Sequence, residues 1–180
     1  RRDADGRMKK GAKKIAALGV LLAAASIVFL IESLIPPLLP IAPYVKIGLA
    51  NCFVLFVLIS FGARDAFLFV LAKNLVTALF SLNGFTILFN LAGSLCAYLI
   101  MAGLYIAVFP KISLVSVSVA GAVMSNIART CVAVSVMEAP SLFVQLPAVC
   151  AFGVAAGIII GVLTTLSVKH LPERLTNFRE

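Results

Sequence analysis

Long apolar runs are the feature that most constrains how this chain can fold. Six stretches with few charged residues are each close to the roughly 20 residues that a helix needs to cross a bilayer. In lipid every backbone N–H and C=O must be paired within the protein, so such runs have to become helices. Transmembrane β-strands alternate apolar and polar residues, and these runs do not. The sequence therefore predicts an all-α membrane protein.

Helix-breaking residues separate the runs and set their limits. Four prolines between residues 36 and 43 end the first run, Asn83 and Gly84 form a turn dipeptide, and Pro110 and Pro140 end the fourth and fifth runs. The predicted spans are 13–35, 46–62, 65–82, 86–109, 113–136 and 143–168. We expect a bundle of six transmembrane helices.

The composition leaves no room for a soluble domain. Of the 180 residues, 62% are hydrophobic and 12% are charged, against about 25% charged in a soluble domain. We predict a basic N-terminal segment over 1–12, a single transmembrane domain over 13–170 and a tail over 171–180.

The distribution of positive charge predicts the orientation. Seven of the fifteen Lys and Arg residues lie in the first 14 residues, and Arg64, Lys111 and Lys169 fall on the same side of the membrane. The positive-inside rule makes that side cytoplasmic. An even number of spans then places both termini in the cytoplasm of a bacterial cell, with the protein in its cytoplasmic membrane. We assign the basic cluster to anionic lipid rather than to nucleic acid.

Polar residues inside the spans are the candidates for function, because a charged group at a helix centre costs about 2.5–3.5 kcal/mol. With this orientation nearly all of them fall in the extracytoplasmic half. The predicted ligand-binding residues are Glu32, Lys46, Asn51, Lys73, Asn74, Asn90, Asn126, Arg129, Thr130 and Gln145. This asymmetry predicts a pocket open to the outside, and its surplus of cations favours an anionic ligand with a carboxylate or phosphate. The alternative is structural: Glu32 would neutralise a buried cation, and the Asn side chains would join helices.

Other chemistry has little support in the sequence. His170 is the one histidine, and Asp3, Asp5 and Asp65 are too scattered to hold the magnesium and diphosphate of a prenyl diphosphate synthase. The cysteines form no CxxC pair, and the GxxxxGKS phosphate loop is absent. We predict no catalytic residue, no metal site, no covalent cofactor and no enzymatic activity.

Small residues at helical spacing mark two faces where helices can approach closely. The last span carries Gly153, Gly157 and Gly161, and the first carries Ala16, Gly19 and Ala23. Each face either packs within this chain or docks on a partner membrane subunit.

Two motifs around the first loop resemble a known family. Glu32-Ser-Leu-Ile-Pro-Pro-Leu-Leu-Pro40 and Lys46-Ile-Gly-Leu-Ala-Asn51, with Arg64-Asp65-Ala66 and Ser125-Asn126-Ile127, are similar to the Gx transporter family, also labelled heptaprenyl diphosphate synthase component I. The resemblance implies a six-helix fold like the S components of energy-coupling factor (ECF) importers. Such subunits bind a vitamin or related micronutrient and dock through their first helix, here Ala16, Gly19 and Ala23, on a transmembrane coupling subunit driven by ATPases.

Three functions remain open at this stage. The first is the substrate-binding subunit of an importer for a small anionic micronutrient or cofactor precursor. The second is a quinone- or flavin-linked component of extracellular electron transfer, because relatives occur near menaquinone and flavin genes. The third is a non-catalytic partner of a prenyl diphosphate synthase. A vitamin, a flavin or a quinone would accordingly be the bound small molecule.

Overall fold

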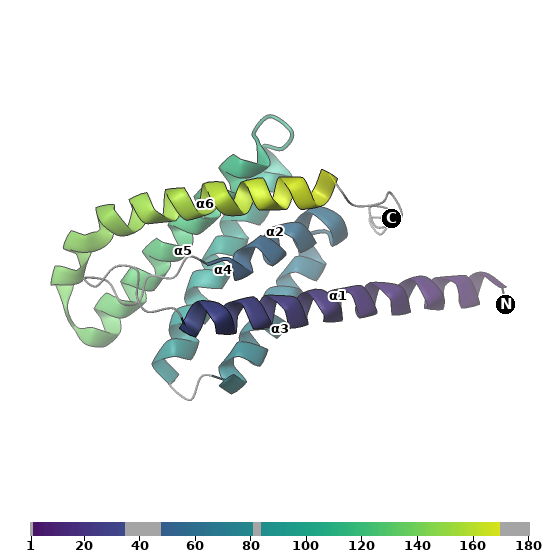
Figure 1. The fold of residues 1–180 in the computed structure, drawn as a ribbon, viewed down its shortest axis with the longest axis horizontal. Coiled ribbons are helices and arrows are strands. Elements are labelled where there is room, and N and C mark those ends of the chain that lie inside the picture. Colours follow the sequence, from purple (N-terminus) through teal and green to yellow (C-terminus); the bar gives the residue numbers. More distant parts are fainter. Residues whose placement is uncertain (1, 35–47, 81–83, 170–180) are drawn as a thin grey trace.

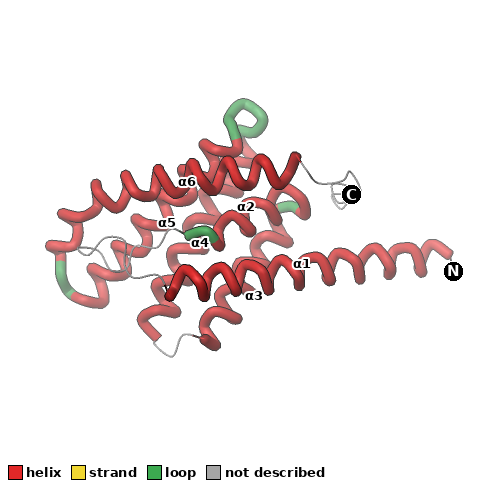
Figure 2. Tube along the Cα trace, in the orientation of Figure 1, coloured by secondary structure: helices red, strands yellow, loops and turns green. Residues whose placement is uncertain are grey.

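The computed structural model describes residues 2–34, 48–80 and 84–169, with side chains described from residue 11 onward. This part of the chain is helical and contains no strand, which confirms the all-α prediction (Figures 1 and 2). Its elements are α1 (Arg2–Leu34), α2 (Ala50–Phe61), α3 (Ala63–Phe80), α4 (Gly84–Ala107), α5 (Leu114–Met137), the short 3-10 helix η1 (Pro140–Gln145) and α6 (Leu146–Lys169). The proline-rich loop, Lys46, Asn83 and the predicted tail lie outside the described residues.

Four segments are long and apolar enough to cross a membrane: Gly11–Leu34, Gly84–Ala107, Leu114–Met137 and Pro140–Lys169. The structure therefore supports a membrane protein. Six crossings stay a prediction, because α2 has only 12 residues and α3 carries three charged residues.

Two glycines explain why α2 is shorter than the predicted span 46–62. Gly48 has φ 77° and Gly62 has φ 96°, in the left-handed region where a side chain is strained and glycine is favoured. Gly48 therefore lies in a turn before α2, and Gly62 makes the sharp junction between α2 and α3.

The helices pack around α2, which contacts all five others. α5 packs along α4 and α6, whereas α1 packs against α2 and α3 at the edge of the bundle (Figure 1). Val54, Leu55 and Leu58 of α2 are fully buried in the hydrophobic core. The first turns of α1 and the last turns of α6 lie at the same end of the molecule (Figure 1), as expected for termini on one side of a membrane.

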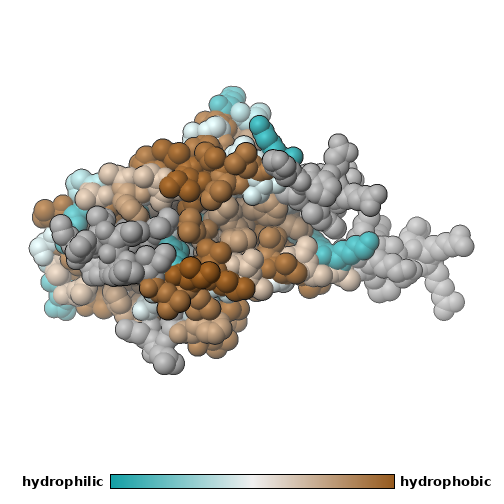
Figure 3. All heavy atoms as spheres, in the orientation of Figure 1, coloured by the Kyte–Doolittle hydropathy of each residue, from teal (hydrophilic) through white to brown (hydrophobic). Residues whose placement is uncertain are grey.

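Hydrophobic side chains dominate the outer surface as well as the core. Large apolar residues such as Val20 on α1, Leu99 on α4 and Ile159 on α6 are exposed. A broad hydrophobic zone covers the middle of the face shown in Figure 3. A soluble monomer rarely exposes such an area, whereas lipid chains cover it without cost. An ion pair between Nζ of Lys14 and Oδ2 of Asp65, 2.7 Å apart, links α1 to α3.

The glycines of α6 pack against α5. A Cβ atom on Gly157 would lie 2.6 Å from Cα of Val119, and one on Gly161 would lie 2.6 Å from Cα of Val115. The helices thus approach so closely that only glycine fits. For the Gly153, Gly157 and Gly161 face, the structure supports packing within the chain.

Candidate functional site

Polar side chains from five helices meet at one buried cavity. Six of the ten predicted ligand-binding residues line it: Glu32, Asn51, Lys73, Asn74, Asn90 and Arg129. Phe29, Gly48, Ala50, Thr77 and Ser94 complete the lining. The cavity has a volume of about 10 Å³, which is enough for one water molecule. The structure thus brings these six residues together at one cavity, which is small in this conformation.

Two cations share this cavity without a direct counter-ion. Lys73 is 4% exposed and Arg129 is 6% exposed. Within the described part of the chain, no carboxylate lies within ion-pair distance of either of them. Glu32, which is also 6% exposed, is close enough for its charge to act on both. The three side chains carry a net charge of +1 when all are ionised, so the cavity is electropositive.

The contacts of the two cations are mostly with neutral groups. Lys73 Nζ donates a hydrogen bond to Oδ1 of Asn51 at 3.3 Å. The Arg129 guanidinium lies over the Phe89 ring, 5.9 Å from its centroid, a cation–π arrangement. Nε of Arg129 is buried and has no hydrogen-bond partner among the described residues. An incoming anion would find hydrogen-bond donors here that are not fully used.

The carboxylate of Glu32 joins the end of α1 to the turn before α2. It accepts a hydrogen bond from the backbone N–H of Gly48. Both residues line the cavity, so this contact closes one of its sides.

Amide and hydroxyl groups hold α3 and α4 together beside the cations. Nδ2 of Asn74 donates to Oγ of Ser94 at 2.7 Å and to the carbonyl of Val70 at 2.8 Å. Ser94 in turn donates to the carbonyl of Asn90 at 2.6 Å. These groups satisfy one another, so their first role is to fix the walls of the cavity. The side-chain oxygen of Asn90 is different, because it is buried without a partner in the described part of the chain.

Gly93 makes room for Arg129. A Cβ atom at this position would lie 2.6 Å from Nε and 2.9 Å from Cγ of Arg129. Gly93, Ser94 and Thr77 were not among the residues predicted from the sequence. Helical spacing relates Ser94 to Asn90 and Thr77 to Asn74, and that signal was available in the sequence. The role of Gly93 depends on Arg129 of the neighbouring helix α5, and spacing along α4 gives no sign of it.

The other predicted residues lie outside the cavity lining. Nδ2 of Asn126 donates to the carbonyl of Val149 at 3.2 Å, which joins α5 to α6. The hydroxyl of Thr130 donates to the carbonyl of Asn126 at 3.0 Å. Gln145 ends η1 and is partly buried. The ligand-binding roles of these three residues and of Lys46 stay predictions.

The predicted docking face on α1 is open. Ala16, Gly19 and Ala23 are all exposed, and a Cβ atom on Gly19 would meet no described atom within 4 Å. A groove of about 280 Å³ runs beside Gly19 between α1 and α3. This face is available to a partner, and docking there stays a prediction.

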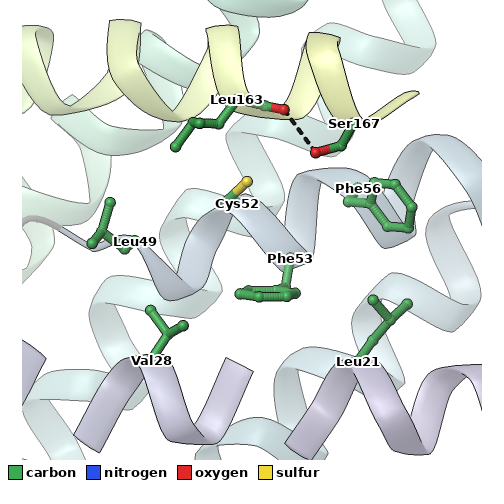
Figure 4. A pocket seen from close by; sticks show the side chains of 8 residues that line it. All are labelled: Leu21, Val28, Leu49, Cys52, Phe53, Phe56, Leu163 and Ser167. Atoms are coloured by element: carbon green, nitrogen blue, oxygen red, sulfur yellow. Dashed lines mark hydrogen bonds between the residues drawn. The ribbon is translucent and has the colours of Figure 1, made fainter. Parts of the chain in front are cut away.

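A larger cavity lies between α1, α2 and α6 and is apolar. It has a volume of about 500 Å³, and its lining is Leu21, Val28, Leu49, Cys52, Phe53, Phe56, Leu163 and Ser167 (Figure 4). Its polar atoms are engaged by the helices: Ser167 donates to the carbonyl of Leu163 at 2.8 Å, and Sγ of Cys52 lies 3.1 Å from Oγ1 of Thr164. This apolar cavity suits lipid chains and not a charged ligand, so the small polar cavity is the candidate site.

An apolar helical bundle that encloses a few charged groups is typical of the multi-helix integral membrane proteins, and this is the class that the structure supports. The chain belongs to the family described as heptaprenyl diphosphate synthase component I, whose family model matches residues 21–167. This confirms the family resemblance expected from the loop motifs. No curated protein and no solved structure matches the chain. The family description names one component of a synthase, and the absence of catalysis by this chain stays a prediction.

Proposed function

We propose that this protein is the substrate-binding membrane subunit of an ECF-type importer and captures a small anionic micronutrient or cofactor precursor from the extracytoplasmic side. One observation carries the proposal: Lys73 and Arg129 are buried at one cavity with a single carboxylate, Glu32, to balance them. An uncompensated charge in a medium of low dielectric constant is unfavourable. A bound anion brings the cavity to neutrality and engages the donors of both cations.

A ligand larger than a water molecule requires the cavity to widen. α1 is the element best placed to move, because it packs against α2 and α3 at the edge of the bundle and is the least buried of the four long apolar segments. Movement of its last turns would take Glu32 away from Gly48 and open the side of the cavity that this contact closes.

The first test is to identify the small molecule that co-purifies with the protein. Denaturing the purified protein releases any bound small molecule, which mass spectrometry can identify. We expect one small anion in near-stoichiometric amount from the wild type and little from Lys73→Met. Lys111→Met, which removes an exposed cation, is the matched control and should retain it. Equal amounts from both variants would argue against the cavity as the binding site, and a flavin or quinone would favour the electron-transfer hypothesis.

The second candidate function follows from the family description. A component of a prenyl diphosphate synthase would present a membrane scaffold to a catalytic partner and would need no ligand of its own. Stable co-purification with a prenyltransferase, together with an empty cavity, would support this function over the importer.

The docking face supplies a test of the importer itself. Gly19→Trp is expected to prevent assembly with a co-expressed coupling subunit and its ATPases while leaving anion binding intact, because the bulky ring would occupy the open face of α1. Gly103→Trp on α4 is the control, since Gly103 also faces open space. Unchanged assembly of Gly19→Trp, measured by co-purification of the ATPases, would place the partner elsewhere.

A further inference from the structure

We infer that the ligand carries a hydrogen-bond donor beside its negative charge. It would be an oxyanion that keeps a proton or that bears a hydroxyl or amino group. The inference rests on the proposed anion-binding function and specifies the class of ligand. Its observation is independent of the two cations: the cavity also presents acceptors. Oδ1 of Asn90 is buried with no partner among the described residues, and the Glu32 carboxylate lines the same cavity.

Some acceptor groups at the cavity are already used and others are not. Oδ1 of Asn51 already accepts from Lys73, and Oγ of Ser94 accepts from Asn74. Glu32 accepts from Gly48, but a carboxylate has room for about four hydrogen bonds. Asn90 and Glu32 therefore retain accepting capacity at a site whose other charged groups are donors.

A ligand that offers only oxygen lone pairs would leave these acceptors unsatisfied. A buried acceptor without a partner bears its full desolvation penalty, and the Glu32 carboxylate would repel a bare anion. An O–H or N–H on the ligand satisfies Oδ1 of Asn90, while the anionic oxygens face Lys73 and Arg129. A site of this kind discriminates strongly against analogues that lack the donor.

Phosphate and sulfate make a matched pair of probes. The two are tetrahedral oxyanions of nearly equal size, but at about pH 7 phosphate keeps a P–OH proton and sulfate keeps none. We expect wild-type protein in lipid nanodiscs to bind phosphate at least about tenfold more tightly than sulfate, as measured by calorimetry or by the shift in thermal unfolding. Glycolate and acetate, which differ by one hydroxyl, should rank in the same order.

Asn90→Leu tests the origin of the preference. No described residue hydrogen-bonds to the side chain of Asn90, so the variant should fold. Because it lacks the acceptor, its preference for phosphate over sulfate should fall about tenfold. Ser125→Ala is the control: it removes a buried hydroxyl that also has no partner among the described residues but lies outside the cavity lining, and it should keep the preference.

The outcomes separate this inference from the proposed function. Equal binding of phosphate and sulfate by the wild type, or an unchanged preference in Asn90→Leu, would overturn the inference and leave an anion site. If none of the four probes binds, the co-purified anion decides: a molecule with an O–H or N–H supports the inference, and one without either overturns it. Absence of any bound anion would overturn the proposed function as well.

Discussion

Arg129→Met is expected to weaken anion binding sharply while leaving the unliganded protein at least as stable as the wild type. Arg129 is buried beside a second cation, and its Nε lacks a partner in the described structure. Without it, Lys73 and Glu32 balance each other. Loss of one member of a buried charge pair costs about 2–5 kcal/mol in binding, so affinity should fall about 30-fold or more. Thermal unfolding without ligand and retention of the co-purified anion measure the two effects.

Asn126→Leu should show the opposite pattern and serves as the control. It removes the hydrogen bond to the carbonyl of Val149 that joins α5 to α6, so unfolding should become easier by about 1–2 kcal/mol. Because Asn126 does not line the cavity, the folded variant should retain its anion. If Arg129→Met instead unfolds as readily as Asn126→Leu and keeps its anion, the role of Arg129 is structural.

Gly157→Val is expected to destabilise the bundle by about 3 kcal/mol, at the upper end of the usual cost of overpacking. The new Cβ would lie 2.6 Å from the backbone of Val119, and a backbone atom cannot move aside as a side-chain tip can. α5 and α6 must therefore separate along their contact, which is the most extensive between any two described helices. Equilibrium unfolding in mixed micelles would measure the loss.

Gly103→Val supplies the matched control, because a Cβ on Gly103 meets no described atom within 4 Å. Its stability should change little, because valine is no less favourable than glycine inside a helix. Equal stability of the two variants would mean that α5 and α6 are not in close contact.

The sequence predicted the long helices well because length and hydrophobicity decide them. The spans 86–109 and 113–136 correspond to Gly84–Ala107 and Leu114–Met137 within two residues. The second span was predicted too long, since hydrophobicity alone cannot show that Gly48 adopts a turn conformation. Whether α2 and α3 cross the membrane depends on their neighbours as well as on their composition.

For the site, the cost of burying charge identified Glu32, Lys73 and Arg129, which the structure brings to one cavity. The same reasoning could not separate Asn90 from Asn126. Both are buried amides, but Asn126 meets a backbone carbonyl of another helix and Asn90 does not. Spacing along one helix says which side chains share a face, and it does not say what that face meets.

The shortness of α2 has an electrostatic consequence. Twelve residues rise about 18 Å, well below the roughly 30 Å of a hydrocarbon core, so α2 alone is too short to cross that core. Its first turn, with Ala50 and Asn51, lines the cavity. The aligned peptide dipoles of a helix place about half a positive charge at that end. In the proposed anion site, part of the attraction would therefore come from the backbone, and it would remain when a single lysine or arginine is replaced.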